Sequence, residues 1–178
     1  MRGFGLSGKP YGKYNYDQFA TDIKTVLDKL NIKDAILGGH SMGGAISLHY
    51  VAKFNAAHVK KLVLFDAVAA KFTLSPTSLT PGLGNWLGGI EAQSSPYATE
   101  QALIALRDED LRSDLPKIKI PTLILHATHD SIVSYALAEQ MKAGIKNATL
   151  VPFEKSGHAA FIEEKDKTNA ELIKFIKE

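Results

Sequence analysis

The sequence predicts an α/β protein with a parallel sheet, because short apolar segments alternate with segments of helical periodicity along the whole chain. Four of the apolar segments have the length and composition of buried strands, at residues 35–37, 61–65, 122–125 and 149–151. Parallel strands need a crossover connection, which is usually a helix, and a stretch of helical spacing lies beside each of these segments. We therefore expect about four parallel strands with helices flanking the sheet.

The first helix is expected to begin after Asn15, because Asn15 is a good N-cap and Gln18 follows three residues later in a capping-box pattern. Apolar residues then recur at helical spacing and give this helix one apolar face: Phe19, Ile23, Val26, Leu27 and Leu30. Further helices are expected from Met42 to about Ala52, from Pro96 to about Arg107, from Val133 to Ile145, and around Leu172 to Ile176.

The length of 178 residues suits one domain, which at this size buries roughly 70% of the surface of its unfolded chain. We expect residues 1–178 to form this domain, with residues 68–115 as a shortened lid inserted into it. Pro and Gly are frequent from residue 68 to residue 95 without a regular period, as is typical of loops. Trp86, Leu87 and Ile90 would line an acyl pocket in the lid or pack on the core.

Composition excludes several classes of function. The net charge of +2 is small and the lysines are scattered, so we expect neither a nucleic acid nor a membrane surface as partner. Cysteine is absent, which excludes disulfides and thiolate catalysis and fits the reducing environment of the cytoplasm. No basic stretch and apolar run follow Met1, so we expect no signal peptide, and no segment reaches the ~20 apolar residues of a membrane span.

The strongest chemical signal is the segment 39–43, in which Ser41 lies between Gly39 and Gly43. An apolar strand precedes this serine and a helical segment follows it, which is the context of a nucleophile elbow. Such a turn exposes the serine oxygen above the sheet, at the positive end of the next helix, where developing negative charge is favoured. Ser41 is therefore the candidate nucleophile.

A nucleophilic hydroxyl needs a base, and the base needs an acid that orients it. In proteins with such an elbow the order along the chain is Ser, then Asp or Glu, then His. Asp130 follows the strand at 122–125, and His158 lies between the last strand and the last helix, so both are expected at the carboxyl edge of the sheet. Asp66 is the alternative acid, since it also ends a buried strand.

The other motifs in the sequence are weaker indications of function. Residues 3–8 match the dinucleotide pattern G-x-G-x-x-G, but no strand precedes them, so we expect a turn near the site and no cofactor. His126, His129 and Asp130 lack a well-placed further ligand, and we expect no metal. Three more histidines are expected in structural, surface or packing roles: His40, His49 and His58.

Four segments together resemble the α/β-hydrolase superfamily, and within it the small esterases known as non-haem chloroperoxidases or perhydrolases: residues 2–10, 39–44, 129–133 and 156–158. The resemblance implies an α/β-hydrolase-like sheet, with Ser41 as nucleophile, His158 as general base and then acid, and Asp130 as the orienting carboxylate. It also implies that the backbone N–H of Met42 is one oxyanion donor. The implied substrates are small carboxylic esters, with no cofactor, and hydrogen peroxide would replace water in a perhydrolase.

Residues 2–5 correspond to a segment that follows the fourth strand in that family, so the N-terminal strands are expected to be absent and the fold to be truncated or minimal. The second oxyanion donor would then come from another amide, between Phe4 and Gly8. The strand before Ser41 would be an exposed edge, which predicts a homo-oligomer formed through the edge or a face of the sheet. Alternative functions are a catalytically impaired, self-associating fragment and a ligand-binding module.

Overall fold

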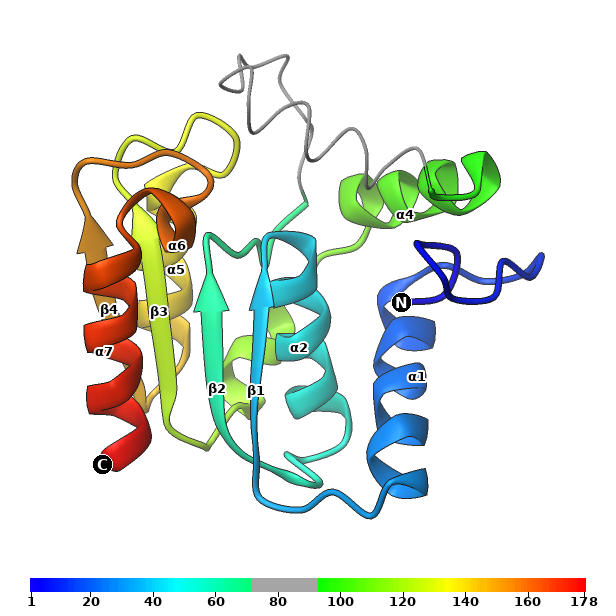
Figure 1. Ribbon diagram of the computed structural model, residues 1–178, viewed down its shortest axis with the longest axis horizontal. Coiled ribbons are helices and arrows are strands. Elements are labelled where there is room, and N and C mark those ends of the chain that lie inside the picture. Colours follow the sequence, from blue (N-terminus) through cyan, green and yellow to red (C-terminus); the bar gives the residue numbers. More distant parts are fainter. Residues whose placement is uncertain (72–92) are drawn as a thin grey trace.

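The computed structural model describes residues 1–71 and 93–178, which form a parallel sheet with helices on both faces (Figure 1). The sheet has the order β1-β2-β3-β4, so that strands consecutive in the sequence are neighbours in space. The strands are β1 (Ala35–His40), β2 (Val59–Phe65), β3 (Thr122–Ala127) and β4 (Ala148–Phe153). The four expected strands are thus confirmed, each extended by one or more residues.

The helices are α1 (Tyr16–Lys29), α2 (Met42–Lys53), α4 (Pro96–Asp108), the 3-10 helix η1 (Arg112–Lys117), α5 (Tyr135–Gly144), α6 (Ala160–Glu163) and α7 (Lys165–Lys177). The helices expected from the sequence correspond to α1, α2, α4, α5 and α7, and two short helices that were not expected, η1 and α6, occur as well. The Asn15 side chain caps α1 by accepting the Gln18 amide at 2.9 Å, whereas the Gln18 side chain donates to Asp22 and does not complete a capping box. Helix α5 begins at Tyr135, two residues later than expected, after a turn in which the amides of Ile132 and Val133 donate to Asp130.

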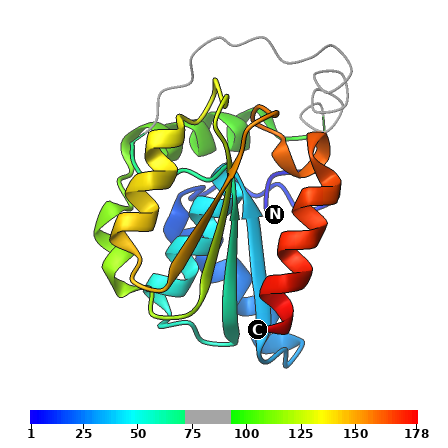
Figure 2. The ribbon, with the colours of Figure 1, turned by 90° about the vertical axis from the view of Figure 1, so that its left-hand side faces the viewer.

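Helices lie on both sides of the sheet (Figure 2), and alternate residues of the strands belong to two different cores. On one face α2 and α5 pack against the sheet, α1 packs against α2, and Leu62, Leu64 and Ile124 belong to this larger core. On the other face Val63, Leu123 and Leu125 belong to a smaller core with α6 and α7. The closing helix α7 therefore lies on the second face, and helices cover both faces of the sheet, as is usual for parallel sheets.

Strand β1 lies at one edge of the sheet. Among residues 1–71 and 93–178 it pairs with β2 alone, so its outer edge has no strand partner. A mainly apolar cavity of about 440 Å³ lies beside it, lined by Phe19 and Val26 of α1, Leu37 of β1 and Ile46 of α2, among others. The lining does not include Ser41, Asp130 or His158.

The region expected to be the lid is described in part. Residues 72–92, with Trp86, Leu87 and Ile90, lie outside the described residues. Helix α4 begins where the sequence predicts, with Ser95 as N-cap and Pro96 as its first residue. None of the described helices has the length and the apolar character that crossing a membrane requires.

Candidate active site

Ser41 occupies the sharp turn between β1 and α2. Its backbone has φ 53° and ψ −122°, a region that residues with side chains rarely adopt. The Ser41 side chain does not cap α2, so its hydroxyl is left for other partners. The strand, the strained turn and the helix together form the elbow that the sequence predicts.

Asp130 and His158 are brought together at the carboxyl edge of the sheet. The His158 Nδ1 lies 2.8 Å from Asp130 Oδ2, while Asp130 Oδ1 accepts the amides of Ile132 and Val133 at 2.8 Å each. Burial alone would raise the pKa of Asp130, but the hydrogen bonds from His158 and from these two amides lower it below its ordinary value. Since the ionised carboxylate can only accept, Nδ1 carries the hydrogen and Nε2 of His158 is left as a proton acceptor.

Carboxylates and a histidine hold the loop that carries His158. Glu164 accepts the Ser156 hydroxyl at 2.8 Å, and Glu163 accepts the Gly157 amide at 2.9 Å. His40, the residue before the nucleophile, places Nε2 at 2.7 Å from the His158 carbonyl oxygen. Burial, together with the neighbouring His158 imidazole, lowers the pKa of His40 to about 4, so that His40 is neutral at neutral pH.

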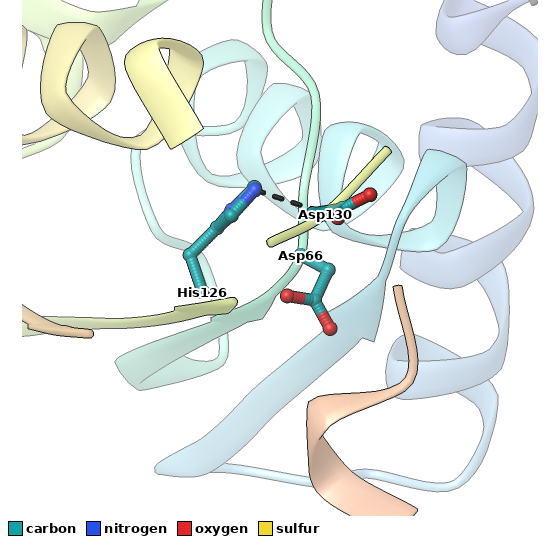
Figure 3. Close-up of side chains that lie close together, drawn as sticks. All are labelled: Asp66, His126 and Asp130. Atoms are coloured by element: carbon teal, nitrogen blue, oxygen red, sulfur yellow. Dashed lines mark ion pairs between the residues drawn. The ribbon is translucent and has the colours of Figure 1, made fainter. Parts of the chain in front are cut away.

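Asp66, the alternative acid, lies close to Asp130 but bonds elsewhere (Figure 3). It is fully buried after β2, and its two oxygens accept the amides of Ala127 at 2.9 Å and Ala160 at 3.3 Å. Burial raises the pKa of Asp66, and the negative charge of Asp130 acts in the same direction. The geometry therefore pairs His158 with Asp130, and Asp66 with the main chain.

His126 is a buried residue of β3, and its side chain lies next to that of Asp130 (Figure 3). Its Nε2 lies 2.8 Å from the Val133 carbonyl oxygen and 3.6 Å from Asp130 Oδ2. A carbonyl oxygen only accepts, so Nε2 carries the hydrogen and His126 steadies the turn from Asp130 to Val133.

Asp66, His126 and Asp130 are the residues whose geometry comes nearest to a metal centre in the described part of the chain, with one ligand atom of each within 4.8 Å of the others. The nitrogen that faces Asp130 is Nε2, which is committed to Val133, and both carboxylates are engaged by backbone amides. These bonds favour a polar network over a metal site. His129, the third ligand considered from the sequence, is exposed and contacts Thr128 instead.

The remaining motifs have structural roles. Residues 3–8 form a turn closed by a hydrogen bond of 2.8 Å from the Gly3 amide to the Gly8 carbonyl. His49 bridges Asp17 and Asp114 at 3.0 and 2.6 Å, and His58 contacts Asp28 at 2.8 Å. These contacts tie helices and loops together, as expected of packing residues.

The sheet is parallel, a serine elbow lies at the end of one strand, and a His–Asp pair lies at the ends of later strands. This is the architecture of an α/β hydrolase. The family described as alpha/beta hydrolase fold matches residues 1–93 and 88–165. The chain belongs to this family.

Several known proteins are similar to the chain. The AB hydrolase superfamily protein YisY of Bacillus subtilis (strain 168) is 39% identical over 210 residues, covering 98% of this chain and 78% of the relative. The bifunctional esterase/perhydrolase DCH of Acinetobacter calcoaceticus is 25% identical, covering 99% and 79%. The structure of an esterase from Exiguobacterium antarcticum superposes with a TM-score of 0.91 at 32% identity, covering 99% of this chain and 79% of that one.

The sequence predicted the elbow and the positions of Asp130 and His158, and it gave Asp66 as the alternative acid, but it did not reveal the contacts that Asp66 makes. Asp66 was visible only as a strand-end aspartate, and its partners are the main-chain amides of two alanines. No side-chain pattern marks such partners in a sequence. The one available signal was the position of Asp66 at the end of a buried strand.

Proposed function

We propose that the protein is a serine hydrolase that cleaves small carboxylic esters through an acyl-enzyme. Ser41 attacks the ester carbonyl while His158 takes its proton, and Asp130 orients His158 and stabilises its charged form. His158 then gives the proton to the leaving alcohol and activates water for deacylation. The reaction needs no metal and no organic cofactor.

The observation that carries this proposal is the 2.8 Å contact between His158 Nδ1 and Asp130 Oδ2. It fixes the tautomer in which Nε2 can accept the proton of a serine hydroxyl. The half-buried turn at Ser41 supplies that hydroxyl, and the family of the chain uses this order of residues.

The oxyanion would be held at the start of α2. Met42 is the first residue of that helix, and the first amides of a helix have no acceptor within it. A second donor is proposed from the turn between Phe4 and Gly8. Within this turn the amides of Phe4 and Ser7 already donate to the carbonyls of Met1 and Phe4, so the other amides of the turn are the better candidates.

A perhydrolase activity of the same site is the second candidate, because one relative is named an esterase/perhydrolase. In this reaction hydrogen peroxide attacks the acyl-enzyme in place of water. The products are a peracid and the free serine, and no redox step by the protein is involved.

Labelling with a fluorophosphonate probe, together with hydrolysis of short p-nitrophenyl esters, tests the proposal. We expect one label per chain and ester turnover, both lost in Ser41→Ala. Ser47→Ala is the matched control, because Ser47 is a buried serine of the same helix whose hydroxyl donates to the Gly43 carbonyl. Folded protein without labelling would indicate an impaired fragment, and saturable ester binding without turnover would indicate a binding module.

A further inference from the structure

Asp66 joins three parts of the molecule around the proposed catalytic pair. It follows β2, and its own amide donates to the Leu125 carbonyl of β3 at 2.9 Å. Its Oδ1 accepts the amide of Ala127, the last residue of β3, and its Oδ2 accepts the amide of Ala160, the first residue of α6. One side chain therefore connects the ends of two strands with the start of a helix.

The two amides that Asp66 accepts flank the His–Asp pair in the sequence. Ala127 lies three residues before Asp130, and Ala160 lies two residues after His158. The contact between Asp130 and His158 depends on the relative position of these two segments. A carboxylate that holds both segments therefore acts on the distance and the angle between Asp130 and His158.

The burial and the backbone conformation of Asp66 are energetically unfavourable, which indicates that its side chain has a role beyond packing. Its side chain is fully buried, and its backbone has φ 43°, in the left-handed region that few residues adopt readily. In the described part of the chain, the side chain of Asp66 accepts hydrogen bonds from main-chain amides. No cationic side chain of this part is a direct partner of Asp66. A buried carboxylate without an ion-pair partner destabilises a fold more than a well-packed neutral residue of similar size does.

The geometry points to Asp66 as a positioning residue for the Asp130–His158 pair, holding the end of β3 and the start of α6 in the register that this contact needs. The inference rests on the proposed function, since it concerns how the same site is held. Three titratable groups face Asp66: His126 on β3, Asp130 in the following turn and His158 in the loop before α6.

The test is Asp66→Asn, which keeps the shape of the side chain and suits the left-handed backbone. The amide has one oxygen, so it can accept only one of the two main-chain N–H groups. We expect kcat for a short p-nitrophenyl ester to fall about 10-fold and KM to change less than about twofold. The matched control is Asp114→Asn, a buried aspartate bound to His49 and Lys117, for which we expect the kcat of the wild type.

A double-mutant cycle separates positioning from general weakening of the fold. If Asp66 acts through Asp130 and His158, Asp66→Asn lowers kcat less than about twofold in the Asp130→Asn background. Equal fold-losses in both backgrounds, or unchanged kcat in folded Asp66→Asn, would overturn the inference. Loss of turnover in Ser41→Ala tests the proposed function separately. Failure of the proposed function can therefore be distinguished from failure of the inference about Asp66.

A measurement on the wild-type protein keeps the inference testable if the variant does not fold. The amide protons of Ala127 and Ala160 should shift with pH in NMR spectra and share one midpoint, because one carboxyl group accepts both. Different midpoints, or no shift of either amide across the acid range in which the protein stays folded, would show that Asp66 does not hold the two segments together.

Discussion

Gly39 and Gly43 lie so close together that a Cβ atom added to Gly39 would lie 2.1 Å from the Gly43 carbonyl oxygen. Gly39 is the fifth residue of β1 and Gly43 lies in the first turn of α2, so this approach sets how tightly the strand and the helix meet at Ser41. A Cβ on Gly43 itself would meet no atom within 4 Å. At the elbow, space is therefore too small for a side chain at Gly39 but not at Gly43, although both glycines belong to the sequence motif.

We expect Gly39→Ala to destabilise the fold by about 3 kcal/mol, because the obstacle is rigid backbone and cannot rotate away. Gly43→Ala is the matched variant and should change the free energy of unfolding by less than about 1 kcal/mol. Urea unfolding of the two variants measures the difference. Similar losses of stability in both would show that the close approach does not constrain the elbow.

His40 should support turnover through the loop that carries His158. Its Nε2–H donates to the His158 carbonyl at 2.7 Å, and the two rings lie 4.7 Å apart between centroids. Removing this bond in His40→Ala should lower kcat about fivefold, since a bond of this kind contributes roughly 1 kcal/mol. His129→Ala, which changes an exposed histidine near the same edge, is the control and should keep full turnover. Wild-type kcat in His40→Ala would contradict the role of this contact.

Asp66 and Asp130 should make stability depend on pH in opposite directions. Burial raises the pKa of Asp66, so the folded state holds its proton more tightly than the unfolded chain, whose aspartates have a pKa of about 3.9. The stability of the wild type relative to Asp66→Asn should therefore fall as pH rises from about 4 through the raised pKa. The pKa of Asp130 is lowered, despite burial, by its hydrogen bonds, so its contribution is present above about 4 and is lost as pH falls below that value.

Urea unfolding of the wild type, Asp66→Asn and Asp130→Asn at a series of pH values from 3 to 7 measures both effects. Each variant is compared with the wild type at the same pH, so that contributions from other carboxyl groups cancel. If the difference in unfolding free energy between wild type and variant changes with pH in the same direction for both variants, the opposite pKa shifts of Asp66 and Asp130 are contradicted.

More of the fold than of the candidate site could be predicted from the sequence. Four strands were predictable because each is a short apolar run between helical segments, yet β1 continues through Gly38 and Gly39, which pair with Val63 and Leu64. Glycine has low strand propensity, so only the neighbouring strand reveals this extension. Asp130 and His158 were predictable from their order and strand-end positions. The role of Asp66 was not, because it depends on amides of alanines far away in the sequence.

Among residues 1–71 and 93–178 strand β1 pairs with β2 alone, which leads us to propose that the 178-residue chain self-associates through this edge. Unpaired main-chain groups along an edge strand favour pairing with another chain, and the apolar cavity beside β1 adds surface that a second copy would bury. Val26 lies in the lining of this cavity and is 53% exposed, so a lysine there introduces a charge without emptying the core. Val26→Lys should weaken association about 10-fold or more, because burying the charge is costly.

Ile173→Lys is the matched control for this proposal, because Ile173 is also 53% exposed but lies on α7, which covers the other face of the sheet. Sedimentation equilibrium over a range of protein concentrations measures the association constant of the three proteins. If Ile173→Lys weakens association as much as Val26→Lys does, the interface is not at β1. A wild-type chain that stays monomeric at every concentration would contradict the proposed self-association.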